Sequence, residues 1–170
     1  MTSINRKPHA WQRVIQKVVA IKPVTRFFAY FVHRVDKFTL QRNGNRFSPT
    51  GALTGLPIAM LTMTGAKTGV QRTLPLVCLH DRDRRVLIAS NLGSRSNPGW
   101  YYNLCANPNV LLSENNKQGK YTARQATHPE RGIYWQQAVN LYAGYKDYQE
   151  RAGGRIIPIM VLEPDGNSKI

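Results

Sequence analysis

The chain has 170 residues, which is enough for one domain with a substantial core. Its 24 Lys and Arg against 9 Asp and Glu give a net charge of +15, which favours anionic partners: nucleic acid, anionic lipid or a multiply charged small molecule. No run approaches the ~18 apolar residues that a membrane-spanning helix needs. There is also no secretory signal pattern, so we expect a cytoplasmic protein.

The basic excess is concentrated at the N-terminus, where residues 1–50 hold ten Lys and Arg but a single acid, Asp36. Apolar residues recur there at helical spacing on both sides of Pro23, which predicts two short amphipathic helices. We expect residues 1–50 to form a basic helical arm and linker, and residues 51–170 to form the domain. The arm has two interpretations: residues 10–40 lie peripherally on the anionic inner face of the cell membrane, or they pack on the domain.

From Ile58 onward the apolar pattern changes from helical to strand periodicity. Strands are expected at 58–64, 70–79, 85–90, 110–114, 120–125 and 156–162. Helices are expected at 99–106, from a capping box at Thr127–Glu130 to about 142, and at 145–151. Hairpin-connected strands with helices inserted late favour a mainly β (α+β) fold, a small antiparallel barrel with flanking helices.

Four details of this domain can be stated in advance. Pro75 marks an edge or a bulge in its strand. Asn97 caps the helix that begins at Pro98, and residues 115–119 form a hairpin turn. Cys78 and Cys105 both lie in apolar surroundings and are expected to be buried thiols without a disulfide framework.

Several enzyme classes are excluded because their motifs are absent. The four His are scattered without zinc spacing, no G-x-S-x-G elbow occurs, and no carboxylate pair is placed for glycoside hydrolysis. The turn at 64–69 lacks the spacing of a nucleotide P-loop and joins strand to strand. It can still bind an anion, because Gly65 and Gly69 allow outward-pointing amides while Lys67 and Arg72 add charge. The alternative is a basic hairpin with no ligand.

Three further stretches could contact a ligand. Ser90 and Asn91 end a buried strand that opens into a Gly/Ser loop. Residues 100–103 (Trp-Tyr-Tyr-Asn) start a helix whose free amides favour an anion, although Trp100 is equally at home in a core. Tyr142, Tyr145 and Tyr148 are spaced by three, which places the phenols on one side of a helix, for core packing or for proton donation.

The order of these motifs is more specific than any one of them. T-x-T-G-x-K-T/S-G-x-x-R-x-x-P-L is followed by A-S-x-x-G, N-P-x-W-Y-x-N-L-x-A-N-P, Y-x-x-Y-x-x-Y and R-x-I-P, from about Gly55 to Pro164. This arrangement resembles the deazaflavin-dependent nitroreductase and quinone reductase family. The resemblance implies a split β-barrel of the FMN-binding type. It also implies coenzyme F420, a deazaflavin with an acidic phospholactyl-oligoglutamate tail, as the reductant for a quinone or nitroaromatic acceptor.

The same resemblance implies roles for particular residues. The cofactor-binding set would be Ala66, Lys67, Thr68, Arg72, Thr73, Ile88, Ala89, Ser90, Asn91, Gly99, Trp100, Tyr101, Tyr102, Asn103 and Tyr145, with no metal. Ser90 would polarise the acceptor oxygen, Tyr145 or Tyr148 would donate the proton, and Tyr142 would gate access. The family's membrane-associated N-terminal helix agrees with the basic arm.

Asn91 and Ala66 stand where many relatives carry a cation, so FMN is the alternative cofactor. Haem in the same barrel is a further alternative. The competing class is a non-enzymatic basic module that binds membrane or nucleic acid, but no RNA-binding signature occurs and we expect no specific nucleic-acid partner.

Overall fold

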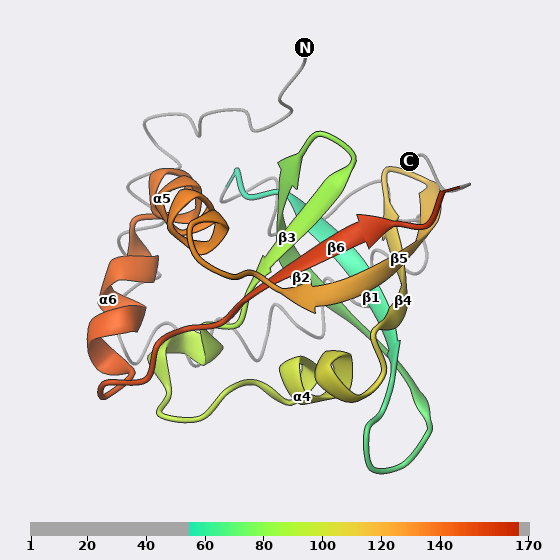
Figure 1. The fold of residues 1–170 in the computed structure, drawn as a ribbon, viewed down its shortest axis with the longest axis horizontal. Helices are drawn as coiled ribbons and strands as arrows, with labels where there is room; N and C mark the ends of the chain where they lie inside the picture. The colour runs from blue at the N-terminus through green and yellow to red at the C-terminus, as the bar shows by residue number, and fades with distance from the viewer. Residues whose placement is uncertain (1–54, 167–170) are drawn as a thin grey trace.

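The computed structural model describes residues 55–166, in which six antiparallel strands form a closed barrel (Figure 1). The predicted helical arm at 1–50 lies outside the described residues. The strands follow one another around the barrel in the order β1-β2-β3-β6-β5-β4, and β4 pairs with β1 to close it. The strands are β1 Ile58–Thr64, β2 Gln71–Asp81, β3 Arg84–Ile88, β4 Asn109–Glu114, β5 Lys117–Gln125 and β6 Ile159–Pro164.

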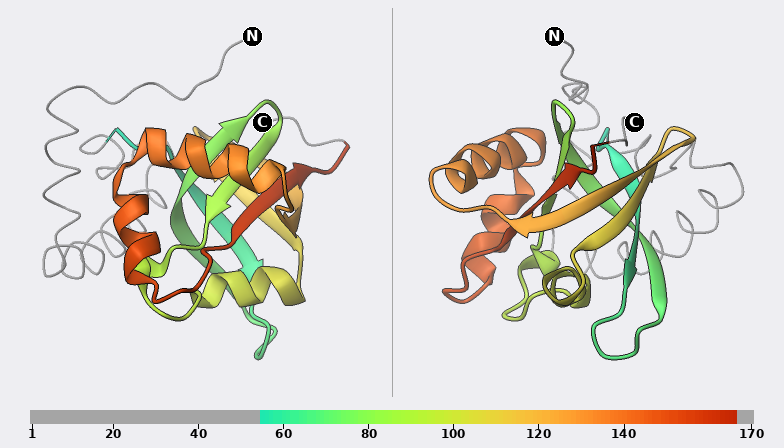
Figure 2. Two further views of the ribbon diagram at one scale, coloured as in Figure 1. Left: turned by 60° about the vertical axis from the view of Figure 1, so that its left-hand side comes forward. Right: turned by 45° about the vertical axis from the view of Figure 1, so that its right-hand side comes forward.

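Three α-helices and one short 3-10 helix complete the described chain: η1 Asn91–Gly93, α4 Gly99–Ala106, α5 Glu130–Leu141 and α6 Gly144–Arg151. Both views in Figure 2 place α4 at one end of the barrel, beside the β1–β2 loop. Helices α5 and α6 cover one side of the barrel wall, and η1 lies next to α6 (Figure 1). No helix within residues 55–166 is long and apolar enough to span a bilayer.

Strand alternation divides the core into two layers. Leu87 and Met160 point into the barrel, where they pack with Leu61, Trp100 and Tyr121. Their neighbours point outward into a second layer under α5 and α6. That layer contains Val86, Ile88, Ile159, Val161 and the three tyrosines of the Y-x-x-Y-x-x-Y motif. The strands β3 and β6 are buried on both faces, which explains why they read as continuous apolar runs.

Several sequence predictions are confirmed and others are wrong. Strand 58–64 and helix 99–106 have the predicted bounds. Pro75 lies in the part of β2 that pairs only with β1, because β3 pairs with residues 78–81 alone, and this agrees with an edge position. The predicted loop at 115–119 is instead a two-residue turn in which Asn115 and Asn116 both have positive φ (48° and 65°), as a type I′ hairpin requires.

Both predicted helix caps are wrong. Asn97 does not cap α4; its side-chain oxygen accepts a hydrogen bond from Arg155 at 2.6 Å. The Thr127–Glu130 capping box does not form either, because Glu130 accepts two hydrogen bonds from Arg124 at 2.7 and 2.8 Å. In each case an arginine, 58 residues from Asn97 and six residues from Glu130, takes the acceptor that local pattern reasoning assigned to the helix backbone.

The two cysteines differ from the prediction and from each other. Both are free thiols; Cys78 is buried inside the barrel, as expected, whereas Cys105 is exposed. The reason is the orientation of α4, which buries Trp100 and Leu104, four positions apart, on one face. Cys105 follows Leu104 directly and therefore lies off that face.

A buried charge cluster closes the end of the barrel opposite α4. Glu114 is 7% exposed and accepts hydrogen bonds from Arg85 Nε at 2.7 Å and from His80 Nε2 at 2.9 Å. Burial by itself raises the pKa of the Glu114 carboxyl, but hydrogen bonds and charges from His80 and Arg85 outweigh it, and the pKa is lowered. The cluster ties the β2–β3 hairpin to β4.

Candidate active site

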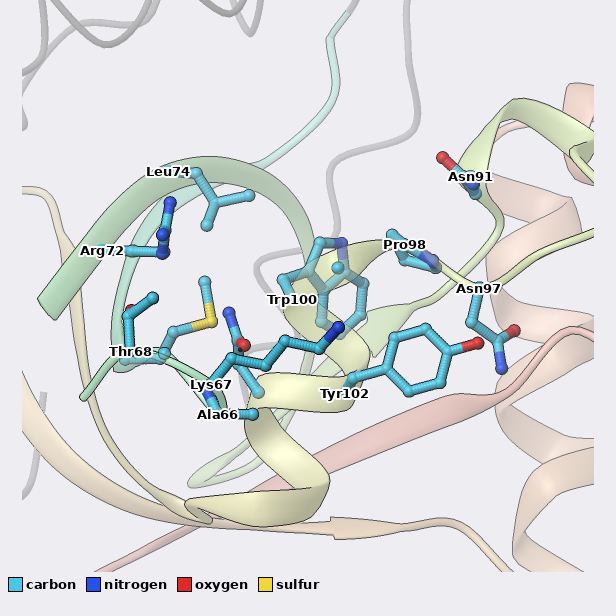
Figure 3. Close-up of a pocket in the computed structure, with 14 residues that line it drawn as sticks. Ala66, Lys67, Thr68, Arg72, Leu74, Asn91, Asn97, Pro98, Trp100 and Tyr102 are labelled. Atoms are coloured by element: carbon cyan, nitrogen blue, oxygen red, sulfur yellow. Dashed lines mark hydrogen bonds between the residues drawn. The ribbon is translucent and has the colours of Figure 1, made fainter. Parts of the chain in front are cut away.

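A cavity of about 900 Å³ lies at the α4 end of the barrel (Figure 3). Three segments surround it: the β1–β2 turn with the start of β2, the first turn of α4, and the loop after β3. Its lining residues are Met63, Gly65, Ala66, Lys67, Thr68, Arg72, Leu74, Asn91, Asn97, Pro98, Gly99, Trp100, Tyr102 and Asn103. Nine of these belong to the set that the sequence implied for cofactor binding.

The β1–β2 turn is held by bonds within itself and to α4. The Gly65 amide donates to the Val70 carbonyl and the Gly69 amide to the Gly65 carbonyl, both at 2.9 Å. A side chain at Gly65 would lie 2.8 Å from Thr68 Oγ1 and 3.2 Å from the Val70 carbonyl, so glycine fits this tight turn best. The Ala66 amide donates to Asn103 Oδ1 at 3.0 Å, which fixes the turn against α4.

These bonds change the anion site that the sequence predicts. The amides of Gly65 and Gly69 were expected to point outward to an anion, but both donate to carbonyls within the turn. The cationic side chains are therefore the main anion-binding groups of this turn. Figure 3 shows Lys67 reaching across the opening toward Tyr102, with Arg72 on the adjoining strand.

The charge of the described cavity lining has one sign. Lys67 and Arg72 are both exposed, and none of the described residues that line the cavity is Asp or Glu. Trp100 supplies an aromatic wall between these cations and the core, and only 9% of its surface is exposed. Core packing and ligand contact, which the sequence offered as alternatives for Trp100, therefore coexist. A cationic rim beside an aromatic wall suits a flat, anionic ligand.

The third wall is a tight left-handed turn. Asn91, Leu92 and Gly93 all have positive φ, at 48°, 54° and 76°. A side chain on Gly93 would collide with the Tyr148 carbonyl at 2.8 Å, so η1 packs directly on α6. The Asn91 side chain lines the cavity and donates to the Ser96 carbonyl at 3.0 Å.

Six residues of the implied cofactor set lie elsewhere, and one of them, Tyr145, belongs to the tyrosine cluster described below. The Thr73 hydroxyl is 2.8 Å from that of Thr62 across the β1–β2 pair, and Tyr101 donates to Gln125 at 2.8 Å. Ile88 and Ala89 are buried in the two core layers. Ser90, directly before η1, is half-buried, and its carbonyl accepts a hydrogen bond from Arg155 at 2.9 Å.

The three tyrosines form a compact buried cluster rather than a cavity wall. Tyr142, Tyr145 and Tyr148 are 6%, 5% and 4% exposed. The ring of Tyr145 meets the other two edge-on, and the hydroxyls of Tyr142 and Tyr148 are 3.1 Å apart. Burial raises the pKa of each phenol, so all three are protonated at neutral pH. Leu92 packs on this layer while its neighbour Asn91 faces the cavity, so η1 separates the two.

Sequence reasoning missed Arg155 and the cavity-lining role of Asn97 and Pro98. Both signals were present: Arg155 begins the R-x-I-P motif, and Asn97-Pro98 begins the motif that carries Trp100. Arg155 had no assigned role and Asn97 only that of a helix cap, because the contacts of Arg155 with Asn97 and Ala89 join residues 58 and 66 positions apart. Leu74 and Met63 follow from strand alternation, since every second residue of β1 and β2 points inward.

Comparisons with known proteins agree with this geometry. The family model described as F420H(2)-dependent quinone reductase matches residues 32–164. An F420H(2)-dependent quinone reductase of Mycobacterium tuberculosis is 38% identical over 109 residues, which are 62% of this chain and 72% of that protein. A solved structure of an F420-H2 dependent reductase is 36% identical, with a TM-score of 0.59 over 63% of this chain and 94% of that chain. A second structure, described as a domain-swapped dimer, has the same identity and TM-score and is covered over 80% of its length.

The family resemblance found in the motifs and the split-barrel fold are thus confirmed. Since the family model covers well over half of the chain, this protein belongs to the F420H(2)-dependent quinone reductase family, oxidoreductases that use F420H2 as reductant.

Proposed function

We propose that the cavity between Lys67, Trp100 and Asn91 binds F420H2 and that quinone reduction takes place at it. The observation that carries this proposal is the charge of the described lining, which pairs two cations with an aromatic wall and includes no carboxylate. An anionic ligand with a flat ring fits this combination, whereas a cationic or bulky apolar ligand does not. A volume of about 900 Å³ is also ample for a cofactor-sized ligand.

The cations would hold the acidic part of the cofactor. Arg72 offers a planar fork suited to a phosphate or carboxylate, and Lys67 offers a mobile point charge above the opening. Ala66 and Thr68 belong to the same turn, which Asn103 fixes on α4. Opposite them, the first turn of α4 would face the ring through Gly99, Trp100 and Tyr102.

When bound, the reduced deazaflavin supplies a hydride for the acceptor. The chain's own part is to orient the two molecules and to provide protons. We assign Ser90 to polarising the acceptor oxygen and Tyr145 or Tyr148 to holding the proton at its phenol oxygen, with Tyr142 gating access. Support comes from the raised pKa of these phenols, which keeps them protonated and able to donate at neutral pH.

The tyrosine assignment makes a demand on the structure. Since η1 lies between the phenols and the cavity, this loop or the rings have to shift for a phenol to reach an acceptor. Thr73, Ile88, Ala89 and Tyr101 would then act by supporting the site rather than by touching the cofactor.

The experiment that tests the proposal is a tryptophan-fluorescence titration with F420, with FMN as the comparison. Trp100 lines the cavity and should be quenched in a saturable manner by F420. Trp100→Phe retains Trp11 and Trp135 and is therefore the matched control, in which most of the quenching disappears. Tighter binding of FMN than of F420 would mean that the cavity is the cofactor site but that FMN is the cofactor. Binding of neither would overturn the proposal.

Two finer assignments rest on sequence alone. Nitroaromatic compounds would be reduced as alternative acceptors at the same cavity. Residues 10–40 would contact an anionic membrane surface peripherally, because they combine basic and apolar side chains at helical spacing. Co-sedimentation with vesicles tests the second assignment. The full chain should sediment with anionic but not with neutral vesicles, and a chain that begins at residue 51 should sediment with neither. Equal sedimentation of the full and the truncated chain would refute the assignment.

A further inference from the structure

The left-handed turn after β3 is an unusual way to build a cavity wall. Asn91 and Leu92 are not glycines, yet both have positive φ, at 48° and 54°. This left-handed conformation is strained for residues other than glycine. Consecutive residues remain there only when surrounding contacts hold them. Identifying what holds this turn therefore identifies what shapes the cavity.

Within the turn, the Gly93 amide donates to the Ser90 carbonyl at 3.0 Å and the Ser94 amide to the Asn91 carbonyl at 2.9 Å. One side chain adds contacts on both sides of the turn. Arg155, in the segment between α6 and β6, donates from Nη1 to the Ala89 carbonyl at 3.3 Å and from Nη2 to the Ser90 carbonyl at 2.9 Å. On the far side of the turn, Nε and Nη2 both donate to the Ser94 carbonyl, at 3.1 and 2.8 Å. The guanidinium thus joins the residues before the turn to the residue after it.

The same guanidinium also reaches the cavity lining. Its Nη1 donates to Asn97 Oδ1 at 2.6 Å, and Asn97 lines the cavity next to Pro98. All three nitrogens of the fork are therefore used on a single loop. Lysine has one ammonium and no planar fork, so it cannot make these contacts together.

Arg155 is itself held in position from α6. Gln149 Nε2 donates to the Arg155 carbonyl at 2.6 Å, and Gln149 Oε1 accepts from the Ile157 amide at 3.0 Å. The loop is thus connected through Arg155 to a helix whose own residues are packed in the core. This arrangement gives the turn a fixed support outside the cavity.

We infer that Arg155 is a positioning residue for the reductase site: its fork holds the loop 89–97 so that Asn91 and Asn97 face the cofactor. The effect on catalysis rests on the proposed function. The hold of Arg155 on the loop, which we call the clamp, is a property of the free protein. Without the fork, the loop samples other conformations and only a fraction of the molecules is competent to bind. Apparent cofactor affinity then falls in proportion to that fraction.

The test compares Arg155→Met, which keeps the length of the side chain without its donors, with Arg95→Met, which removes an equal charge from the same loop. In the cofactor-free protein, hydrogen exchange over 89–98 should rise in Arg155→Met and stay unchanged in Arg95→Met. The KM for F420H2 should rise about tenfold in Arg155→Met while kcat at saturating cofactor stays within about twofold, because bound cofactor restores the competent loop.

A purely structural role would lower the melting temperature and leave both the exchange pattern and KM unchanged; that result overturns the inference. A fall in kcat with unchanged KM also overturns it, because it would assign Arg155 to the chemical step. If Arg155→Met does not fold, Arg155→Lys is measured instead, with the same direction expected and a smaller rise in KM. If the wild-type protein fails to bind F420H2, the proposed function fails. The hydrogen-exchange comparison still shows whether Arg155 holds the loop.

Discussion

The two cations of the cavity give the sharpest prediction. Replacing Lys67 and Arg72 together by Met removes both charges from the described lining while keeping apolar side chains of similar length. Both residues are exposed, so water and salt screen them, and each contact with an anionic tail is expected to contribute about 1 kcal/mol. Since 1.36 kcal/mol corresponds to a factor of ten, the double variant should bind F420 about 30-fold more weakly.

The assay is a binding titration with F420 and with a tail-less deazaflavin, at low and at high salt. The tail-less compound lacks the anionic groups, so its affinity should change by less than about threefold, within the range of a surface substitution. Wild-type affinity for F420 should fall as salt rises, because the screening length shortens from about 10 Å at 0.1 M to about 3 Å at 1 M. The double variant should have lost most of this salt dependence.

The matched control removes the same charge from the other end of the barrel. Lys117 and Lys120 are exposed on β5, beyond the hairpin turn opposite the cavity, and their double Met variant should bind F420 within about twofold of wild type. If the control weakens binding as much as the cavity variant does, the net charge of the protein decides affinity. If both ligands lose affinity equally in the cavity variant, Lys67 and Arg72 act only on the shape of the turn. Either result refutes the local argument.

Two further predictions concern buried groups. Glu114→Gln leaves the guanidinium of Arg85 buried without its carboxylate, which should lower the free energy of unfolding by about 3–5 kcal/mol in urea melts. Because the folded-state pKa of Glu114 is lowered, the wild-type protein should lose this contribution to stability as pH falls below about 4.3. The stability of Glu114→Gln should therefore fall less steeply in acid. An equally steep fall in both proteins would contradict this role of Glu114. Tyr145→Phe should lower turnover by about tenfold while F420 affinity is retained, as steady-state kinetics can measure. An unchanged kcat would remove Tyr145 from the proton step and leave it a core residue.

Much of the fold could be predicted from local pattern. The strand 58–64 was placed correctly because a short, mostly apolar run ends at the Gly65 turn, and the helix 99–106 because Pro98 and Pro108 bound it. The turn residues Lys67 and Arg72 were assigned to the site because glycines on both sides of a basic hairpin indicate an anion-binding turn. Family resemblance added the cofactor, and the family match confirms it.

Local pattern was misleading where a polar side chain had a choice of partners. Asn97 and Glu130 both stand where helix caps are common, but each accepts from an arginine instead. A cap is worth about 1 kcal/mol, and a hydrogen bond from a charged donor about 1.5–3 kcal/mol, so the arginine outweighs the helix backbone. Arg155 lies 58 residues from Asn97, and although Arg124 lies only six residues before Glu130, local pattern does not show that these two side chains meet.

The sequence by itself determined the order of strands and helices, the excess of positive charge and the motifs that identify the family, because each depends on neighbours along the chain. Only the tertiary structure decided which face of each element meets the cavity. It buries the three tyrosines behind η1, exposes Cys105, and brings Arg155 to a loop 58 to 66 residues earlier in the chain. These outcomes depend on how the closed barrel positions α4, η1 and α6 relative to one another, and barrel closure is set by pairing between distant strands.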